Sequence, residues 1–145
     1  MSTVFDVAAY ILRERGEMTA MKLQKLVYYA YAWHLVWEGE KLFDERIEAW
    51  ANGPVVRELY KVHRGQFKVK ELLKGDSNAI ARNKPVKSSV DAVLKFYGDK
   101  TPFFLSELTH SEEPWKKARK GLGVGEHGRK KIKDAWMEQY YSALV

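Results

Sequence analysis

The segment from Leu26 to Trp37 restricts the fold of this chain more than any other. Thr19 can cap a helix that ends at Gly39, and between Leu26 and Trp37 that helix is apolar or aromatic on nearly every side. Such a helix is either surrounded by other elements or keeps one side for a partner, and we expect it to be the central helix. The run contains His34 and is shorter than the roughly 20 residues that cross a bilayer. We therefore expect no membrane span and no membrane partner.

Helical patterns dominate the rest of the sequence. Thr3 and Asp6 match a capping box, ahead of a first helix that stops at Gly16. The same signals predict further helices at about 54–63, 88–98 and 102–108, after 111–114 and at 129–143, with a short helical turn near 71–74. Residues 40–51 favour a short extended segment. The expected fold class is mainly α: a compact single domain, residues 1–145, of about seven helices with a short β element.

Metal and thiol chemistry find little support in the composition. The 145 residues include no cysteine, which excludes disulfides, thiolate metal sites and a cysteine nucleophile. The four histidines, His34, His63, His110 and His127, are too far apart for a zinc motif. His34 and His63 fall on the apolar sides of their helices, where we expect hydrogen-bonded core histidines. We expect no metal and no cofactor.

Motifs of catalysis are also absent or lie in the wrong context. Residues 123–128, GVGEHG, match the glycine pattern of dinucleotide sites, but they follow a helix, and the chain stops before an acidic residue could follow about 20 positions later. We interpret them as a flexible loop. Glu112 and Glu113 stand at a helix start, where negative charge is favourable, so we interpret them as capping residues. The sequence predicts no catalytic residue and no enzyme.

The positive charge of the chain is concentrated near its C-terminal end. The formal net charge is +6, whereas residues 116–133 alone carry +7. Two interpretations stay open: a solvated basic loop, or a surface that attracts phosphate or an acidic partner. The basic residues that follow the glycines are the candidate partner-binding residues of this segment: Arg129, Lys130, Lys131 and Lys133.

A second candidate surface lies on the central helix. Lys22, Lys25, Tyr29 and Trp33 project away from the stripe of Leu23 and its apolar neighbours, and they combine aromatic with basic character. Tyr and Trp suit protein recognition because they join a large contact area to a polar tip. The alternative is that other helices bury Tyr29 and Trp33 inside the domain. Trp50, just before the expected third helix, is interpreted as structural.

Four blocks of sequence, in this order, resemble the Panacea, or SocA-like antitoxin, domain. They are LQKLVYYAYAWH at 23–34, GEKLF at 39–43, EAWANGPVVRELY at 48–60 and LTHSEEPWKKAR at 108–119. The resemblance extends over roughly residues 5–143. It departs from the family pattern mainly at GLGVGEHGRKK, which is rich in glycine and basic residues.

The resemblance implies a mainly helical bacterial or phage antitoxin that neutralises a cognate toxin protein by direct binding. In one branch of the family the antitoxin instead acts as an adaptor that delivers the toxin to an ATP-dependent protease, which makes such a protease a second candidate partner. A nucleic-acid-binding regulator that uses residues 116–133 stays open, although no helix-turn-helix signature supports it. The N-terminal segment lacks the basic region and cleavage site of a secretory signal, so we expect a cytoplasmic protein.

Overall fold

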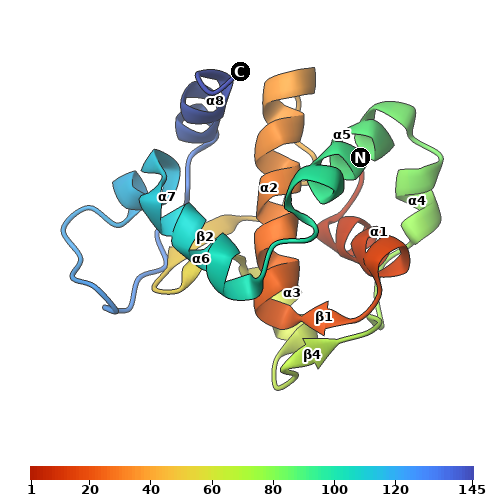
Figure 1. The fold of residues 1–145 in the computed structure, drawn as a ribbon, viewed down its shortest axis with the longest axis horizontal. Coiled ribbons are helices and arrows are strands. Elements are labelled where there is room, and N and C mark those ends of the chain that lie inside the picture. The colour runs from red at the N-terminus through yellow and green to blue at the C-terminus, as the bar shows by residue number, and fades with distance from the viewer.

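Helix α2, Ala20–Glu38, runs through the middle of the molecule, and other helices flank it on both sides (Figure 1). The computed structural model describes residues 1–145. The Thr19 hydroxyl accepts a hydrogen bond from the Lys22 amide at the start of α2, and Gly39 ends the helix in the left-handed conformation. Burial extends around α2, as the apolar sequence predicts. The expectation of a central helix is confirmed.

Seven more helices surround α2. The first, α1 at Val4–Arg15, begins with the predicted capping box of Thr3 and Asp6 and ends at Gly16. The others are α3 at Arg57–His63, α4 at Ser77–Ala81, α5 at Lys84–Tyr97, α6 at Pro102–Ser111, α7 at Glu113–Ala118 and α8 at Asp134–Ser142. The mainly α fold class is confirmed, with eight helices where the sequence predicts about seven. Helix α4 was missed: the turn is at 77–81, capped by Asp76, and not at 71–74.

The β structure is a hairpin and one further pair of short strands. Strand β2, Ile47–Trp50, lies within the predicted extended segment and pairs with β3, Gly53–Val56. Strands β1, Met18–Thr19, and β4, Lys68–Val69, form the second antiparallel pair. Pro54 was predicted to begin a helix, which is wrong because it lies in β3, opposite Ala49. A two-stranded hairpin tolerates proline because both of its strands are edges.

Two helix boundaries also differ from the prediction. Helix α5 begins at Lys84, ahead of the expected 88, because Asn83 caps it. Helix α8 begins at Asp134 and not at 129, because residues 129–132 run beside β2. There the Ala49 amide donates to the Lys130 carbonyl at 2.8 Å, and the Ile132 amide donates to the Ile47 carbonyl at 2.9 Å. Backbone pairing with the hairpin therefore replaces the first turn of the expected helix.

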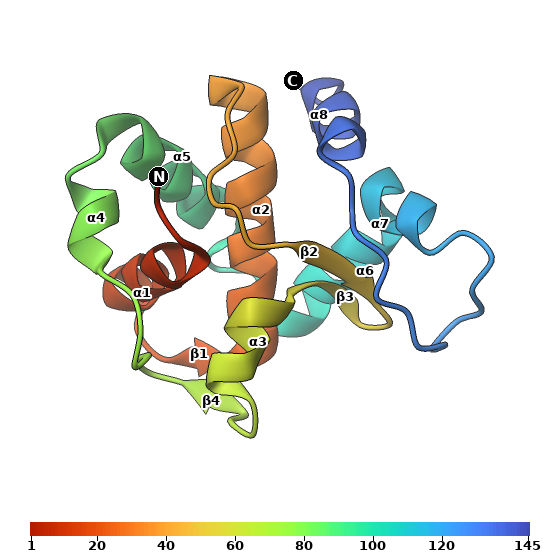
Figure 2. The same ribbon diagram turned by 180° about the vertical axis from the view of Figure 1, so that it is seen from behind.

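One hydrophobic cluster of 34 buried residues joins the elements. Helices α1, α5, α6 and α8 all contact α2, so the N-terminal and C-terminal parts of the chain share its core. Figure 2, from behind, shows the segment that leads into β2 crossing in front of α2, while the β2–β3 hairpin extends to the right of α2 in front of α6, with α3 below it and the loop before α8 to the right. None of the helices has both the length and the apolar character that crossing a membrane requires.

Candidate functional site

A pocket of about 660 Å³ lies where four parts of the chain meet. Its walls come from the first turns of α2, the β2–β3 hairpin, α3 with the turn that follows it, and the loop between α7 and α8. No aspartate or glutamate lines this pocket. Its lining includes five lysine and arginine residues, Lys25, Arg57, Lys61, Arg64 and Arg129, so the pocket is strongly basic.

Lys25 is the innermost of these cations. Its side chain is buried, with only 1% of its surface exposed, and its ammonium group makes one hydrogen bond, to the Pro54 carbonyl at 3.3 Å. A lysine ammonium has three donors, so two of them have no partner in the protein. No carboxylate lies within ion-pair distance of Lys25, and burial lowers its pKa to about 8.

The hairpin is shaped around the Lys25 side chain. Gly53 has φ +123°, and a Cβ atom on it would lie 2.5 Å from Cε of Lys25. Only glycine accommodates both this backbone conformation and this close approach. Gln24, the residue before Lys25 on α2, bonds the hairpin twice: its amide oxygen accepts from the Val56 amide at 2.9 Å, and its amide nitrogen donates to the Val56 carbonyl at 3.2 Å. The same nitrogen lies 3.0 Å from Nε2 of His63.

Arg119 and Trp115 do not line the pocket, but they bond to the hairpin that forms part of its wall. The guanidinium of Arg119 donates to the carbonyls of Ala49 and Gly123, which ties the glycine loop to the hairpin. The Trp115 indole donates to the Trp50 carbonyl at 2.8 Å. Arg119 is therefore a buried structural residue, although it belongs by sequence to the basic segment.

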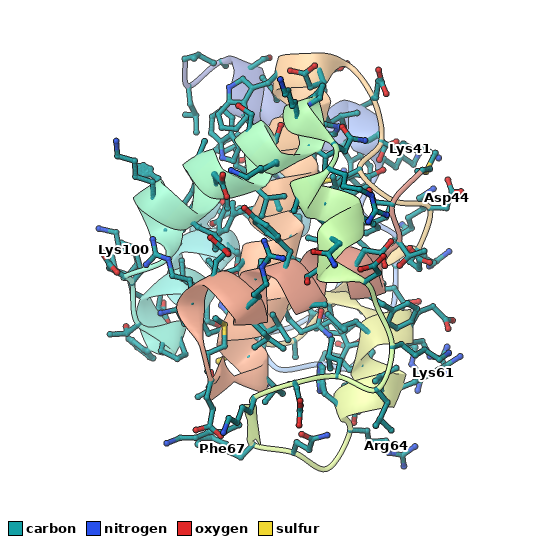
Figure 3. The ribbon with its side chains drawn as sticks, turned by 90° about the vertical axis from the view of Figure 1, so that its right-hand side faces the viewer. Lys41, Asp44, Lys61, Arg64, Phe67 and Lys100 are labelled. Atoms are coloured by element: carbon teal, nitrogen blue, oxygen red, sulfur yellow. The ribbon has the colours of Figure 1, made fainter.

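The cations at the pocket rim are mostly without acidic partners. Lys61 pairs with Glu58 at 3.2 Å, but no carboxylate lies within ion-pair distance of Arg57, Arg64 or Arg129. Figure 3 shows Lys61 and Arg64 extending from α3 on the side of the molecule away from Lys100. The pocket thus combines one buried cation with several exposed ones, an arrangement that attracts anions.

A second polar cluster lies deeper along α2 and has a different character. The Tyr29 and Tyr141 hydroxyls donate to Oε1 of Glu112 at 2.8 and 2.7 Å, and the Tyr28 and Tyr141 hydroxyls lie 3.0 Å apart. Glu112 is 4% exposed. Burial raises its pKa, and the hydrogen bonds from Tyr141 and Tyr29 partly oppose that shift. We call these four residues, Tyr28, Tyr29, Glu112 and Tyr141, the tyrosine–glutamate cluster.

The recognition surface expected on α2 is therefore wrong in two of its four residues. Lys25 and Tyr29 are buried in the domain, so they cannot form an exposed face. Trp33 is half-buried, and its indole donates to the Tyr97 hydroxyl at 2.9 Å. Lys22 is half-buried as well. The alternative of burial holds for Tyr29, because three side chains surround it: Tyr97 of α5, Tyr141 of α8 and Glu112, which lies between α6 and α7.

The basic segment has more order than the sequence suggests. Arg129, Lys130, Lys131 and Lys133 are exposed, but the backbone from 129 to 132 is fixed beside β2. Of these four, only Arg129 lines the pocket, which brings it together with Lys25. The Lys133 ammonium lies 5.2 Å from the centre of the Trp136 ring. The GVGEHG motif follows helix α7 in a loop, as expected.

The remaining predictions concern single polar residues. His34 and His63 are buried, and Nδ1 of His34 lies 2.8 Å from the Ser89 hydroxyl, so both core assignments are confirmed. Capping by the Glu112 side chain is wrong because that side chain turns inward to the tyrosines. Trp50 is half-buried, and its indole donates to Glu48 at 2.8 Å. No three histidine or acidic side chains are grouped as metal ligands.

Sequence reasoning missed the contributions of Gln24, Gly53 and Arg119. The sequence marks two of them only by their neighbours: Gln24 is a polar residue in an apolar helix, and Gly53 precedes a proline at a turn. The distant partners of these side chains are not encoded in local patterns.

These features define a mainly helical protein with a buried polar core and a basic pocket. The family model of the antitoxin SocA-like, Panacea domain matches residues 23–116, and the chain belongs to this family. The match includes α2 from Leu23 onward, the hairpin and α7 up to Lys116, so Lys25, Gly53 and Glu112 all lie within it. Comparison with curated proteins gave no match, and neither did comparison with solved structures.

Proposed function

We propose that the protein is an antitoxin that binds a cognate toxin protein directly and neutralises it without catalysis, in the cytoplasm of a bacterium or in phage-infected cells. The observation that carries this proposal is membership of the SocA-like antitoxin family, through a match over residues 23–116. We extend the functional domain to residues 1–145 because α1 and α8, outside the match, pack against α2.

A continuous row of aromatic side chains is the best candidate for the toxin-binding surface. Trp37 stacks on Trp33 with ring centres 5.2 Å apart, Trp33 bonds to Tyr97, and Phe96 stacks on Tyr97 at 4.8 Å. Trp37 and Phe96 are 44% and 62% exposed. Exposed tryptophan and phenylalanine are typical of the centres of protein interfaces. We call Trp33, Trp37, Phe96 and Tyr97 the α2–α5 aromatic surface.

The exposed cations of the C-terminal segment have a supporting role in this proposal. Arg129, Lys130, Lys131 and Lys133 attract an acidic partner over a distance, whereas aromatic contacts hold the complex together. Neutralising the four cations should slow toxin association at low salt and leave dissociation nearly unchanged.

Co-expression with the toxin candidate encoded by the neighbouring gene tests the proposal. The antitoxin should restore growth and form a complex that survives size-exclusion chromatography. The double variant Trp37→Ala, Phe96→Ala should lose both effects. Phe67→Ala is the matched control, because Phe67 is 78% exposed and lies in the turn before β4, beyond the opposite end of α2 (Figure 3). Rescue of growth by turnover of a substrate, with no complex formed, would contradict the proposal.

Two further measurements distinguish direct neutralisation from the other modes of action. An adaptor for an ATP-dependent protease would make the toxin disappear, and deleting the protease would then abolish rescue. A nucleic-acid-binding regulator would shift its own promoter DNA in a gel, with an affinity that falls steeply as salt rises. Direct neutralisation predicts a stable toxin level and rescue without promoter binding.

A further inference from the structure

Lys25 presents a charge that the fold does not balance. The residue lines the pocket, and its buried ammonium has a single hydrogen bond, to the Pro54 carbonyl, and no carboxylate in reach. A buried charge without a partner is costly, and hydrophobic replacement of such groups often stabilises a protein. The stability of the fold therefore does not explain why a cation stands at this position.

The surroundings of Lys25 point to an anion as the missing partner. Arg57, Arg64 and Arg129 line the same pocket without acidic partners, and no lining residue is acidic. The volume of about 660 Å³ lies inside the range of roughly 300–1,000 Å³ typical of small-molecule sites. Arginine and lysine are the side chains that bind phosphate best.

The pocket also offers an aromatic wall. Trp50 and Tyr60 line it, with ring centres 5.0 Å apart in an edge-to-face arrangement, and neither ring is fully buried. Such rings provide contact area for the organic part of a ligand. A bare inorganic ion would leave this wall unused.

We propose that this pocket binds a small organic phosphate, whose phosphate group pairs with Lys25 and the rim arginines while its organic part contacts Trp50 and Tyr60. This site is separate from the α2–α5 aromatic surface, since the two share no residue. Binding here does not depend on the toxin and goes beyond the proposed antitoxin activity.

The test is calorimetric titration of the full chain with ATP and with pyrophosphate, in a buffer free of phosphate, sulfate and magnesium. Both probes should bind at one site and compete. Lys25→Met should weaken ATP binding roughly thirtyfold or more, as expected when one partner of a buried charge pair is removed. Arg129→Gln, at the exposed rim, should weaken it about two- to fivefold.

Lys120→Gln is the matched control, because Lys120 is an exposed cation of the same basic segment that does not line the pocket. ATP binding should be unchanged in this variant. Three results would overturn the proposal: no saturable binding of either probe, equal weakening in Lys120→Gln and Lys25→Met, or binding that survives Lys25→Met and Arg129→Gln together. An acidic peptide that binds through Lys25 when neither probe does would assign the pocket to a protein partner and would also overturn it.

Discussion

Lys25 and Tyr29 stand one turn apart on α2, and both are buried, yet their surroundings differ. The Tyr29 hydroxyl belongs to a cluster in which each polar group has a close partner within the protein. The Lys25 ammonium has one bond and two unused donors. Burial alone therefore does not separate a structural polar residue from a binding residue. The two kinds of residue are distinguished by whether their polar groups have hydrogen-bond partners within the protein.

The pKa shifts express the same contrast. Burial raises the pKa of Glu112, but hydrogen bonds from two tyrosines stabilise the charged carboxylate and oppose that shift. Burial lowers the pKa of Lys25 to about 8, and no neighbouring group opposes it. Groups within the protein thus stabilise the charge of Glu112 in the tyrosine–glutamate cluster, whereas no group of the protein balances the charge of Lys25.

The largest effect is expected from Glu112→Ala. This change removes the acceptor of two buried hydroxyls, and hydrogen bonds to charged groups are worth about 1.5–3 kcal/mol each. The free energy of unfolding should fall by about 3–5 kcal/mol, measured by urea denaturation. Glu113→Ala alters the exposed neighbour and should change stability by less than about 0.5 kcal/mol. Similar losses in both variants would show that the cluster does not support the core.

Lys25→Met should have the opposite sign and stabilise the free protein by about 1–3 kcal/mol at pH 7. The folded pKa of Lys25 is about 8, below the ordinary 10.5, so the unfolded chain binds more protons between these values. Between pH 8 and 10.5 the free energy of unfolding of the unchanged protein should therefore rise relative to that of Lys25→Met. Urea denaturation at pH 7, 9 and 10.5 measures the difference between the two proteins. A difference that does not shrink as pH rises would mean that Lys25 carries no uncompensated charge.

The smallest effect is expected from Tyr141→Phe, which keeps the ring and removes one hydroxyl. Glu112 keeps its bond from Tyr29, but it loses the bond from Tyr141, and the Tyr28 hydroxyl loses its partner. The free energy of unfolding should therefore fall by about 1.5 kcal/mol, the low end of the range for a hydrogen bond to a charged group, in thermal or urea denaturation. Tyr140→Phe is the control, since the half-buried Tyr140 makes no hydrogen bond through its hydroxyl within the protein. If Tyr141→Phe has no more effect than Tyr140→Phe, the cluster is held by ring packing and not by hydrogen bonds.

Much of the local structure could be predicted from the sequence. The capping box of Thr3 and Asp6, the cap at Thr19 and the stops at Gly16 and Gly39 all lie where the pattern places them. These features depend on backbone groups within a few residues, which the neighbouring sequence contains. The four sequence blocks also predicted the family, which the match over residues 23–116 confirms.

Tertiary structure decided which residues face the pocket and which are enclosed. The sequence grouped Lys25 with Tyr29 and Trp33, but the hairpin at Gly53 encloses Lys25, while Glu112 and Tyr141 enclose Tyr29. It likewise placed Arg129 in a helix, and pairing with β2 brings it to the pocket wall. These contacts join positions as far apart in the sequence as Tyr29 and Tyr141, and they depend on which elements pack together. The sequence by itself determined most of the helices, the charge and the family, and only packing decided that Lys25 and Arg129 line one pocket and that Glu112 bonds the tyrosines.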